Sequence, residues 1–138
     1  MRPNADSQNL ADVEYTFGNN NQNINWPHRK GEETVTDTFT FTQCFTPQAS
    51  QREVYLTCVE EIIDNFIKGY NCSFLAYGQT ASGKTYTILG PSGEGEELTG
   101  MVPQAVGDIF SKIESLKTFD KTKKVDLDLS VFEIHNEK

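Results

Sequence analysis

The chain has 138 residues, of which 36% are hydrophobic and 23% are charged, and this is enough for one domain with its own core. Its formal net charge of −8 disfavours nucleic acids and anionic membrane surfaces as partners, because both attract lysine and arginine. No apolar run has the length that crosses a bilayer, and the N-terminus lacks the apolar segment of a signal peptide, so we expect a soluble, intracellular protein.

The first third of the chain is predicted to contain little regular structure. Residues 1–34 look irregular, and the asparagine-rich run at 18–25 has the polar, turn-prone composition of a surface loop. Residues 34–41, Thr-Val-Thr-Asp-Thr-Phe-Thr-Phe, are rich in β-branched and aromatic side chains. This composition predicts a strand pair or a single edge strand.

A long amphipathic helix is predicted over about residues 51–68. Ser50 and Glu53 have the spacing of a capping box, in which the serine oxygen accepts an N–H at the start of the helix. Gly69 is a natural end. The apolar residues of the stripe are Val54, Cys58, Val59, Ile62, Ile63, Phe66 and Ile67.

Residues 72–77 form a short, nearly uninterrupted apolar run, Cys-Ser-Phe-Leu-Ala-Tyr, which predicts a strand buried on both faces, as in a parallel sheet. A helix of one or two turns is expected over residues 85–89 and should end at Gly90-Pro91. The acidic run at 92–97 is predicted to be a flexible loop.

The last third of the chain is predicted to hold one helix and one strand. The helix covers about residues 103–117, with a proline at its first position, where a missing N–H costs nothing. Its apolar stripe consists of Val106, Ile109, Phe110, Ile113 and Leu116. Residues 125–131 alternate strictly between apolar and polar, which predicts a strand with one buried face.

Residues 78–85, Gly-Gln-Thr-Ala-Ser-Gly-Lys-Thr, fit the pattern G-x-x-x-x-G-K-T of a loop that holds nucleotide phosphates. Gly78 and Gly83 let the backbone curl so that its N–H groups point inward. Lys84 is placed to reach the β- and γ-phosphates, and Thr85 to bind Mg²⁺. A predicted strand before the loop and a helix after it favour a phosphate site over a chance match. The pattern alone leaves an ATPase, a GTPase and a kinase open.

The motifs around this loop resemble those of kinesin motor domains and occur in the order typical of that family. Residues 76–87, A-Y-G-Q-T-A-S-G-K-T-Y-T, are closely similar to the family's phosphate loop. The other matches are Arg2-Pro3 to R-x-R-P, Phe39–Phe41 to F-x-F-D, Ser50–Tyr55 to S-Q-x-x-V-Y, Gly69–Asn71 to G-Y-N, Gly100–Pro103 to G-I-I-P, and Val131–Glu137 to S-F-x-E-I-Y-N-E. Thr42, Gln104 and His135 depart from the family pattern.

This resemblance implies a fold and a site. The fold would be the α/β, three-layer α/β/α P-loop NTPase fold, incomplete, with a central mixed β-sheet and flanking helices, and residues 1–138 would be the N-terminal portion of the motor domain. The nucleotide ATP or ADP, with Mg²⁺ on Thr85, would be bound by Gly78, Gln79, Thr80, Ala81, Ser82, Gly83, Lys84 and Thr85. Tyr86 would stack on the adenine, or else be a core aromatic residue. Arg2 and Pro3 would border the base, although Arg2 is equally well explained as an exposed terminal residue.

The resemblance also implies ATP hydrolysis coupled to movement along microtubules, in the cytoplasm and on the cytoskeleton. The sequence contains neither N-x-x-S-S-R-S-H nor D-L-A-G-S-E, the family's two switch motifs, so no catalytic residue is assigned here. We therefore expect a truncated part of a motor or an incomplete gene model, marginally stable or aggregated, and without the microtubule-binding face. Two alternatives stay open: another P-loop enzyme, such as a small kinase or a GTPase, and a non-catalytic nucleotide-binding module.

A steady-state ATPase assay tests the expectation of weak activity. The purified 138-residue chain should show no motor-like turnover, because phosphoryl transfer needs groups from several segments at once and both switch motifs are absent from this sequence. Turnover at the rate of a motor would contradict this expectation.

Overall fold

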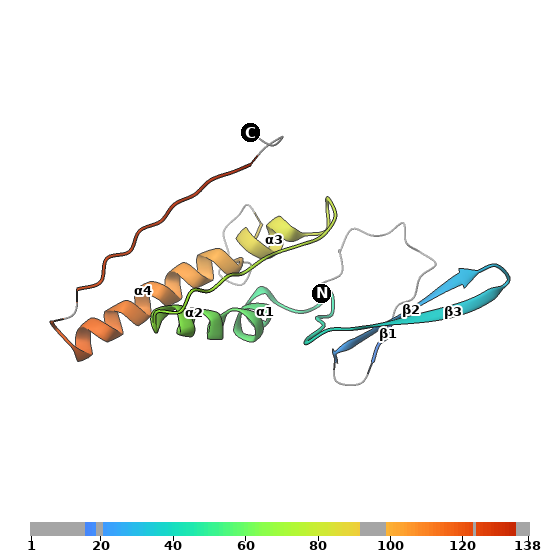
Figure 1. Ribbon diagram of the computed structural model, residues 1–138, viewed down its shortest axis with the longest axis horizontal. Helices are drawn as coiled ribbons and strands as arrows, with labels where there is room; N and C mark the ends of the chain where they lie inside the picture. The colour runs from blue at the N-terminus through green and yellow to red at the C-terminus, as the bar shows by residue number, and fades with distance from the viewer. Residues whose placement is uncertain (1–15, 19–20, 92–98, 123, 135–138) are drawn as a thin grey trace.

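The computed structural model describes residues 16–18, 21–91, 99–122 and 124–134. Figure 1 shows a small β-sheet at one end of an elongated molecule and a group of helices at the other. The predictions for the acidic run at 92–97 lie outside the described residues.

The sheet has three antiparallel strands in the order β1-β2-β3. β1 (Thr16–Phe17) pairs with the first part of β2 (Asn23–Lys30), which pairs along its whole length with β3 (Glu33–Thr40). A tight turn joins β2 to β3, and its first residue, Gly31, has a φ of +70°, as hairpin turns of this kind require. β3 confirms the strand predicted at 34–41.

The prediction of irregular structure for residues 1–34 is wrong for β2, which takes in the last three residues of the run at 18–25 that looked like a surface loop. Cross-strand pairing outweighs the poor strand propensity of asparagine: Thr38 Oγ1 donates a hydrogen bond of 2.9 Å to Asn25 Oδ1. Pro27 lies past the end of the pairing between β1 and β2, so its missing N–H costs β1 no hydrogen bond.

The predicted long amphipathic helix is confirmed, but it is divided in two. α1 (Gln51–Cys58) and α2 (Glu60–Ile67) meet at Val59, whose φ of −120° departs from the helical range. Hydrogen bonds continue through this break, from Val59 N to Tyr55 O at 2.8 Å and from Ile63 N to Val59 O at 3.0 Å. The two segments therefore remain one hydrogen-bonded unit.

Both ends of this unit form as predicted. Ser50 Oγ accepts a hydrogen bond from Glu53 N at 3.0 Å, which is the serine half of the capping box. At the other end Gly69 has a φ of +95°, and Tyr70 N donates to Asn65 O at 3.1 Å. A left-handed glycine with hydrogen bonds back to the last turn is a common way to end a helix.

The other two predicted helices also form. α3 (Lys84–Leu89) matches the helix expected at 85–89, starting one residue earlier. α4 (Met101–Phe119) extends two residues beyond each end of the range 103–117. Among the described residues, no helix combines the length and apolar composition needed to cross a membrane.

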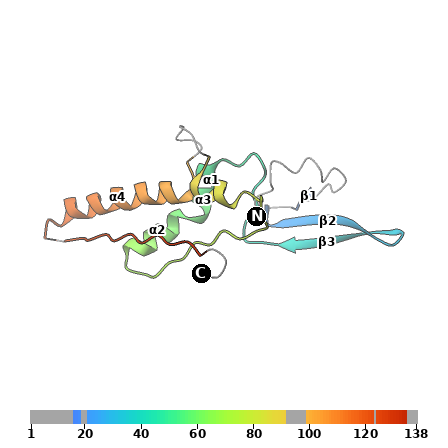
Figure 2. The ribbon, with the colours of Figure 1, turned by 90° about the horizontal axis from the view of Figure 1, so that it is seen from above.

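The core lies where α1, α2 and α4 pack together, with α4 running along the other two helices (Figure 2). Its buried members are Phe45, Ala49, Val54, Tyr55, Val59, Ile63 and Met101. Tyr55 is fully buried, and its hydroxyl donates a hydrogen bond of 2.6 Å to Asp108 Oδ2 on α4. Lys112 Nζ donates to Asp64 Oδ1 at 2.6 Å and links α4 to α2, which holds the pKa of Asp64 below its usual range.

Two predicted strands are absent from the described structure. Residues 72–77 and 125–131 are extended but unpaired, and apolar side chains in them are exposed, with Leu75 at 83% and Leu129 at 82%. A strand needs a neighbour for its N–H and C=O groups, and the described residues bring none alongside either segment. The prediction of a strand buried on both faces at 72–77, and of one with a buried face at 125–131, is therefore wrong for this structure.

Tyr55→Phe tests the bond that joins α1 to α4. It should lower the free energy of unfolding by about 1–2 kcal/mol at neutral pH, because Asp108 loses a buried donor. Burial and the Asp108 carboxylate raise the pKa of Tyr55, so the native state keeps a proton that the unfolded chain loses at a pH of about 10. Wild-type stability should therefore fall above that pH, and the difference from Tyr55→Phe should shrink.

Urea unfolding over a range of pH values measures both effects. Tyr70→Phe is the matched control, because Tyr70 is exposed. The stability of this variant should follow that of the wild type at every pH. A constant gap between wild type and Tyr55→Phe at alkaline pH would contradict the assignment.

Candidate nucleotide-binding site

The glycine-rich loop joins the extended segment 71–77 to α3 (Figure 1). Two of its residues have a left-handed backbone, Ala81 with a φ of +61° and Gly83 with a φ of +83°. Ser82 N donates to Gln79 O at 3.2 Å and closes a turn between them. Where left-handed and right-handed residues alternate just before a helix, successive backbone N–H groups point to one side. This is the geometry of an anion-binding nest.

The two glycines of the pattern are required for different reasons. At Gly78, a Cβ would lie 2.5 Å from Ser82 Oγ, so a side chain there would force Ser82 to move. At Gly83 there is open space, with no atom within 4 Å, but the positive φ strains any residue other than glycine. The loop thus needs space at one position and conformational freedom at the other.

Lys84 is the first residue of α3, and its side chain turns back over the loop. Its Nζ donates to Gly78 O at 2.8 Å and to Gln79 O at 2.6 Å. The ammonium group therefore lies against the loop that the sequence pattern assigns to phosphates, held there by neutral carbonyl acceptors. A phosphate oxygen is a stronger acceptor for this group than a carbonyl oxygen, because its negative charge adds Coulomb attraction to the ammonium.

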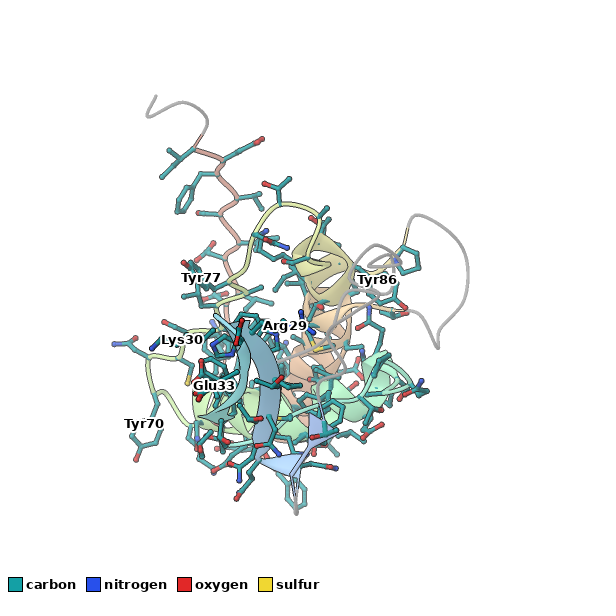
Figure 3. All side chains as sticks on the ribbon, turned by 90° about the vertical axis from the view of Figure 1, so that its right-hand side faces the viewer. Arg29, Lys30, Glu33, Tyr70, Tyr77 and Tyr86 are labelled. Atoms are coloured by element: carbon teal, nitrogen blue, oxygen red, sulfur yellow. The ribbon has the colours of Figure 1, made fainter. Side chains whose placement is uncertain are left out.

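Thr85 and Tyr86 follow on the exposed side of α3. Tyr86 is 36% exposed, so the alternative that it is a buried core residue is not supported. Figure 3 shows its ring beside α3 and well apart from Tyr77, the residue just before the loop. The structure brings residues 78–86 together in one turn and helix start, whereas Arg2 and Pro3 lie outside the described residues.

Sequence reasoning missed two residues that hold α3 in place. Gln51, at the start of α1, is 2% exposed, and its Nε2 donates to Tyr86 O at 2.6 Å. Gly100 donates its N–H to Leu89 O at 3.3 Å, and a Cβ on it would clash with the backbone of residues 88–90. In the sequence, the available signal was that these residues belong to the S-Q-x-x-V-Y and G-I-I-P motifs. Neither motif indicates which residues they contact.

The fold and this loop define a P-loop protein, and comparisons with known proteins identify its family. A family model described as "Kinesin motor domain" matches residues 1–138. The chain is 40% identical over 104 residues to the kinesin-like protein KIN-5B of Oryza sativa subsp. japonica, which covers 72% of this chain and 10% of that protein. It is 36% identical over 116 residues to kinesin heavy chain isoform 5C of Rattus norvegicus, a match that covers 81% of this chain and 12% of that protein.

The chain belongs to the kinesin motor domain family. It spans about a tenth of the length of the curated relatives that it matches. Among solved structures, a fast kinesin superposes with a TM-score of 0.70 at 26% identity, covering 83% of this chain and 32% of that one. Drosophila NOD, in complex with divalent manganese and ADP, gives a TM-score of 0.62 at 26% identity, covering 80% and 35%. These likenesses confirm the predicted fold class, a partial kinesin-type P-loop α/β fold.

Gly83→Ala tests the left-handed position at the helix start. It should weaken the first turn of α3 by about 1 kcal/mol, the approximate cost of placing a Cβ in this backbone region. The Thr87 N–H, which donates to Gly83 O at 2.9 Å, should then exchange with deuterium about fivefold faster.

Gly107→Ala is the matched control for that substitution. Gly107 lies inside α4 with no atom within 4 Å of a Cβ, so alanine there should stabilise the protein by about 0.5–1 kcal/mol. Equal effects of the two substitutions on the Thr87 amide would contradict the role given to Gly83.

Proposed function

We propose that residues 78–86 bind the phosphates and the base of ATP or ADP, and that the protein to which they belong is an ATP-driven microtubule motor. The observation that carries this proposal is the ammonium group of Lys84 folded onto a loop with two left-handed residues. Family membership supports it, as does the ADP and divalent metal in the complex of Drosophila NOD.

Phosphate binding exchanges one set of acceptors for another. In the structure Lys84 Nζ donates to two loop carbonyls, and in the proposed complex it donates to β- and γ-phosphate oxygens. The N–H groups of residues 78–85 are the proposed further donors, and the Gln79–Ser82 turn and the Lys84 hydrogen bonds shape the loop before binding. This arrangement spares the loop most of the ordering cost that a flexible loop would pay.

A magnesium ion is the proposed partner of the phosphates. Thr85 Oγ would be its protein ligand, together with phosphate oxygens, as in other P-loop proteins. When bound, the metal neutralises charge on the phosphates. Thr85 is exposed at the second position of α3, next to Lys84, so its hydroxyl is accessible to a metal–phosphate complex at the loop.

Tyr86 is the proposed contact to the base. Its ring is partly exposed beside α3, and an aromatic ring presents a flat apolar face on which adenine can stack. Arg2 and Pro3 remain proposed neighbours of the base on the resemblance of their motif alone.

Hydrolysis and movement are proposed for the whole protein rather than for these residues, because the chain spans about a tenth of its curated relatives. Drosophila NOD has been docked on a microtubule, and its structure superposes on this chain with a TM-score of 0.64 at 27% identity. A microtubule partner and a place on the cytoskeleton in the cytoplasm follow for this protein as part of the proposal. A nucleotide-binding module without turnover is the second candidate.

Lys84→Ala tests the site directly. Titration with a fluorescent ATP analogue in the presence of Mg²⁺ should show binding by the wild type, and affinity about 10- to 100-fold lower for Lys84→Ala, since the loop loses its only side-chain ammonium group. Lys117→Ala removes the same charge from an exposed position on α4 and should leave affinity unchanged.

The same titration separates the two candidates when it is followed by sedimentation with microtubules. Because the microtubule partner is proposed for the whole protein, the sedimentation uses that protein: nucleotide binding with co-sedimentation supports the motor, and nucleotide binding without it favours the module. Equal affinity of wild type and Lys84→Ala would overturn the assignment of the loop.

A further inference from the structure

Gln51 is the one polar side chain buried in the described part of the chain, with 2% of its surface exposed. A glutamine is seldom buried this deeply, because its amide must find partners for both donor and acceptor atoms. The neighbouring core residues Val54 and Tyr55 are apolar or aromatic and fix the start of α1 by packing. Burial of an amide at this place therefore calls for an explanation other than core packing.

The amide of Gln51 is directed to α3 rather than to its own helix. Its Nε2 donates to Tyr86 O at 2.6 Å, a contact between residues 35 positions apart in the sequence. The same carbonyl also accepts the Gly90 N–H at 2.9 Å, so the α3 backbone keeps its own hydrogen bond. The contact therefore holds α3 at Tyr86, which directly follows Lys84 and Thr85 in the sequence.

α3 needs such an external contact because it is weakly supported by itself. It has six residues, none of which is buried, and no side chain caps its start. A helix of this length is unstable in isolation, since nucleation is not repaid by so few backbone hydrogen bonds. Gly100 holds the C-terminal end of α3 through Leu89 O, and Gln51 holds its third residue through Tyr86 O.

We propose that Gln51 is a positioning residue of the nucleotide site, which holds the first turn of α3 so that Lys84 and Thr85 are oriented for the phosphates and the metal. The inference rests on the proposed function of residues 78–86. It adds that the affinity of the loop for a nucleoside triphosphate depends on a hydrogen bond from α1. The buried end of α1 and the nucleotide site are thereby coupled through the Tyr86 carbonyl.

Gln51→Met tests this role, because methionine has nearly the same length and volume but no donor. Affinity for a fluorescent Mg·ATP analogue should fall about five- to tenfold, the loss expected for one buried hydrogen bond. Gln51→Glu, whose carboxylate repels the Tyr86 carbonyl, should lose at least as much. The amide protons of Thr87 and Gly90 should exchange faster in both variants.

Tyr55→Phe is the matched control, since it removes a hydrogen bond from the same helix without touching α3. It should lower global stability and leave nucleotide affinity and the exchange of the α3 amides unchanged. A purely structural role for Gln51 predicts instead that all three variants change affinity only in proportion to their loss of stability, and this result would overturn the inference.

The unaltered protein provides a second measurement that does not depend on whether the variants fold. In an NMR spectrum the side-chain amide of Gln51 should exchange slowly with solvent, and its resonance should move when Mg·ATP is added. A resonance that does not move overturns the inference. If wild type binds nucleotide but Gln51→Met binds equally well, the inference alone fails; if wild type and Lys84→Ala both fail to bind, the proposed function fails with it.

Discussion

The packing of α1 and α2 against α4 is the interaction on which the rest of this structure depends. Tyr55 lies at its centre, fully buried, with its hydroxyl bonded to Asp108 on the opposite helix. The glycine-rich loop and α3 contribute no buried side chain of their own. Gln51 on one side and Gly100 on the other help to hold them against this helical layer.

The candidate site therefore combines a strained loop with a firm attachment. The left-handed backbone of Ala81 carries a local cost, which a protein can support only where neighbouring structure fixes the conformation, whereas Gly83 adopts the same region without strain. The gain is that donors point to one side before any ligand arrives. An arrangement of this kind favours tight and specific binding of a compact anion over binding of larger, softer ligands.

Local signals in the sequence predicted the parts of the fold that are held by local interactions. The Ser50 cap, the end of the helix at Gly69 and the approximate positions of α3 and α4 follow from spacing and from single residues, and the structure shows each of them. The glycine pattern of the loop was visible for the same reason. The positions of Tyr86 and of the loop residues relative to α3 also follow from their adjacency in the chain.

Features that depend on distant partners could not be predicted in this way. β2 contains asparagines and a proline, and its pairing with β1 and β3 makes it a strand. Conversely, residues 72–77 and 125–131 have the composition of strands but lie unpaired, because composition supplies no neighbour. The role of Gln51 depends on a contact with Tyr86, to which no periodicity or motif points. Exposed, unpaired segments of this composition also favour association between chains.

The junction between Gly100 and the end of α3 has a consequence for how such proteins vary. Because the Gly100 N–H is bonded to Leu89 O, the chain leaves α3 and enters α4 at nearly the same point. Lengthening the connection between these two residues would cost little, since the entropy of closing a loop grows only slowly with its length. The length of the connection between Leu89 and Gly100 can therefore change, in evolution or by insertion of a peptide tag, while the glycine-rich loop keeps its shape.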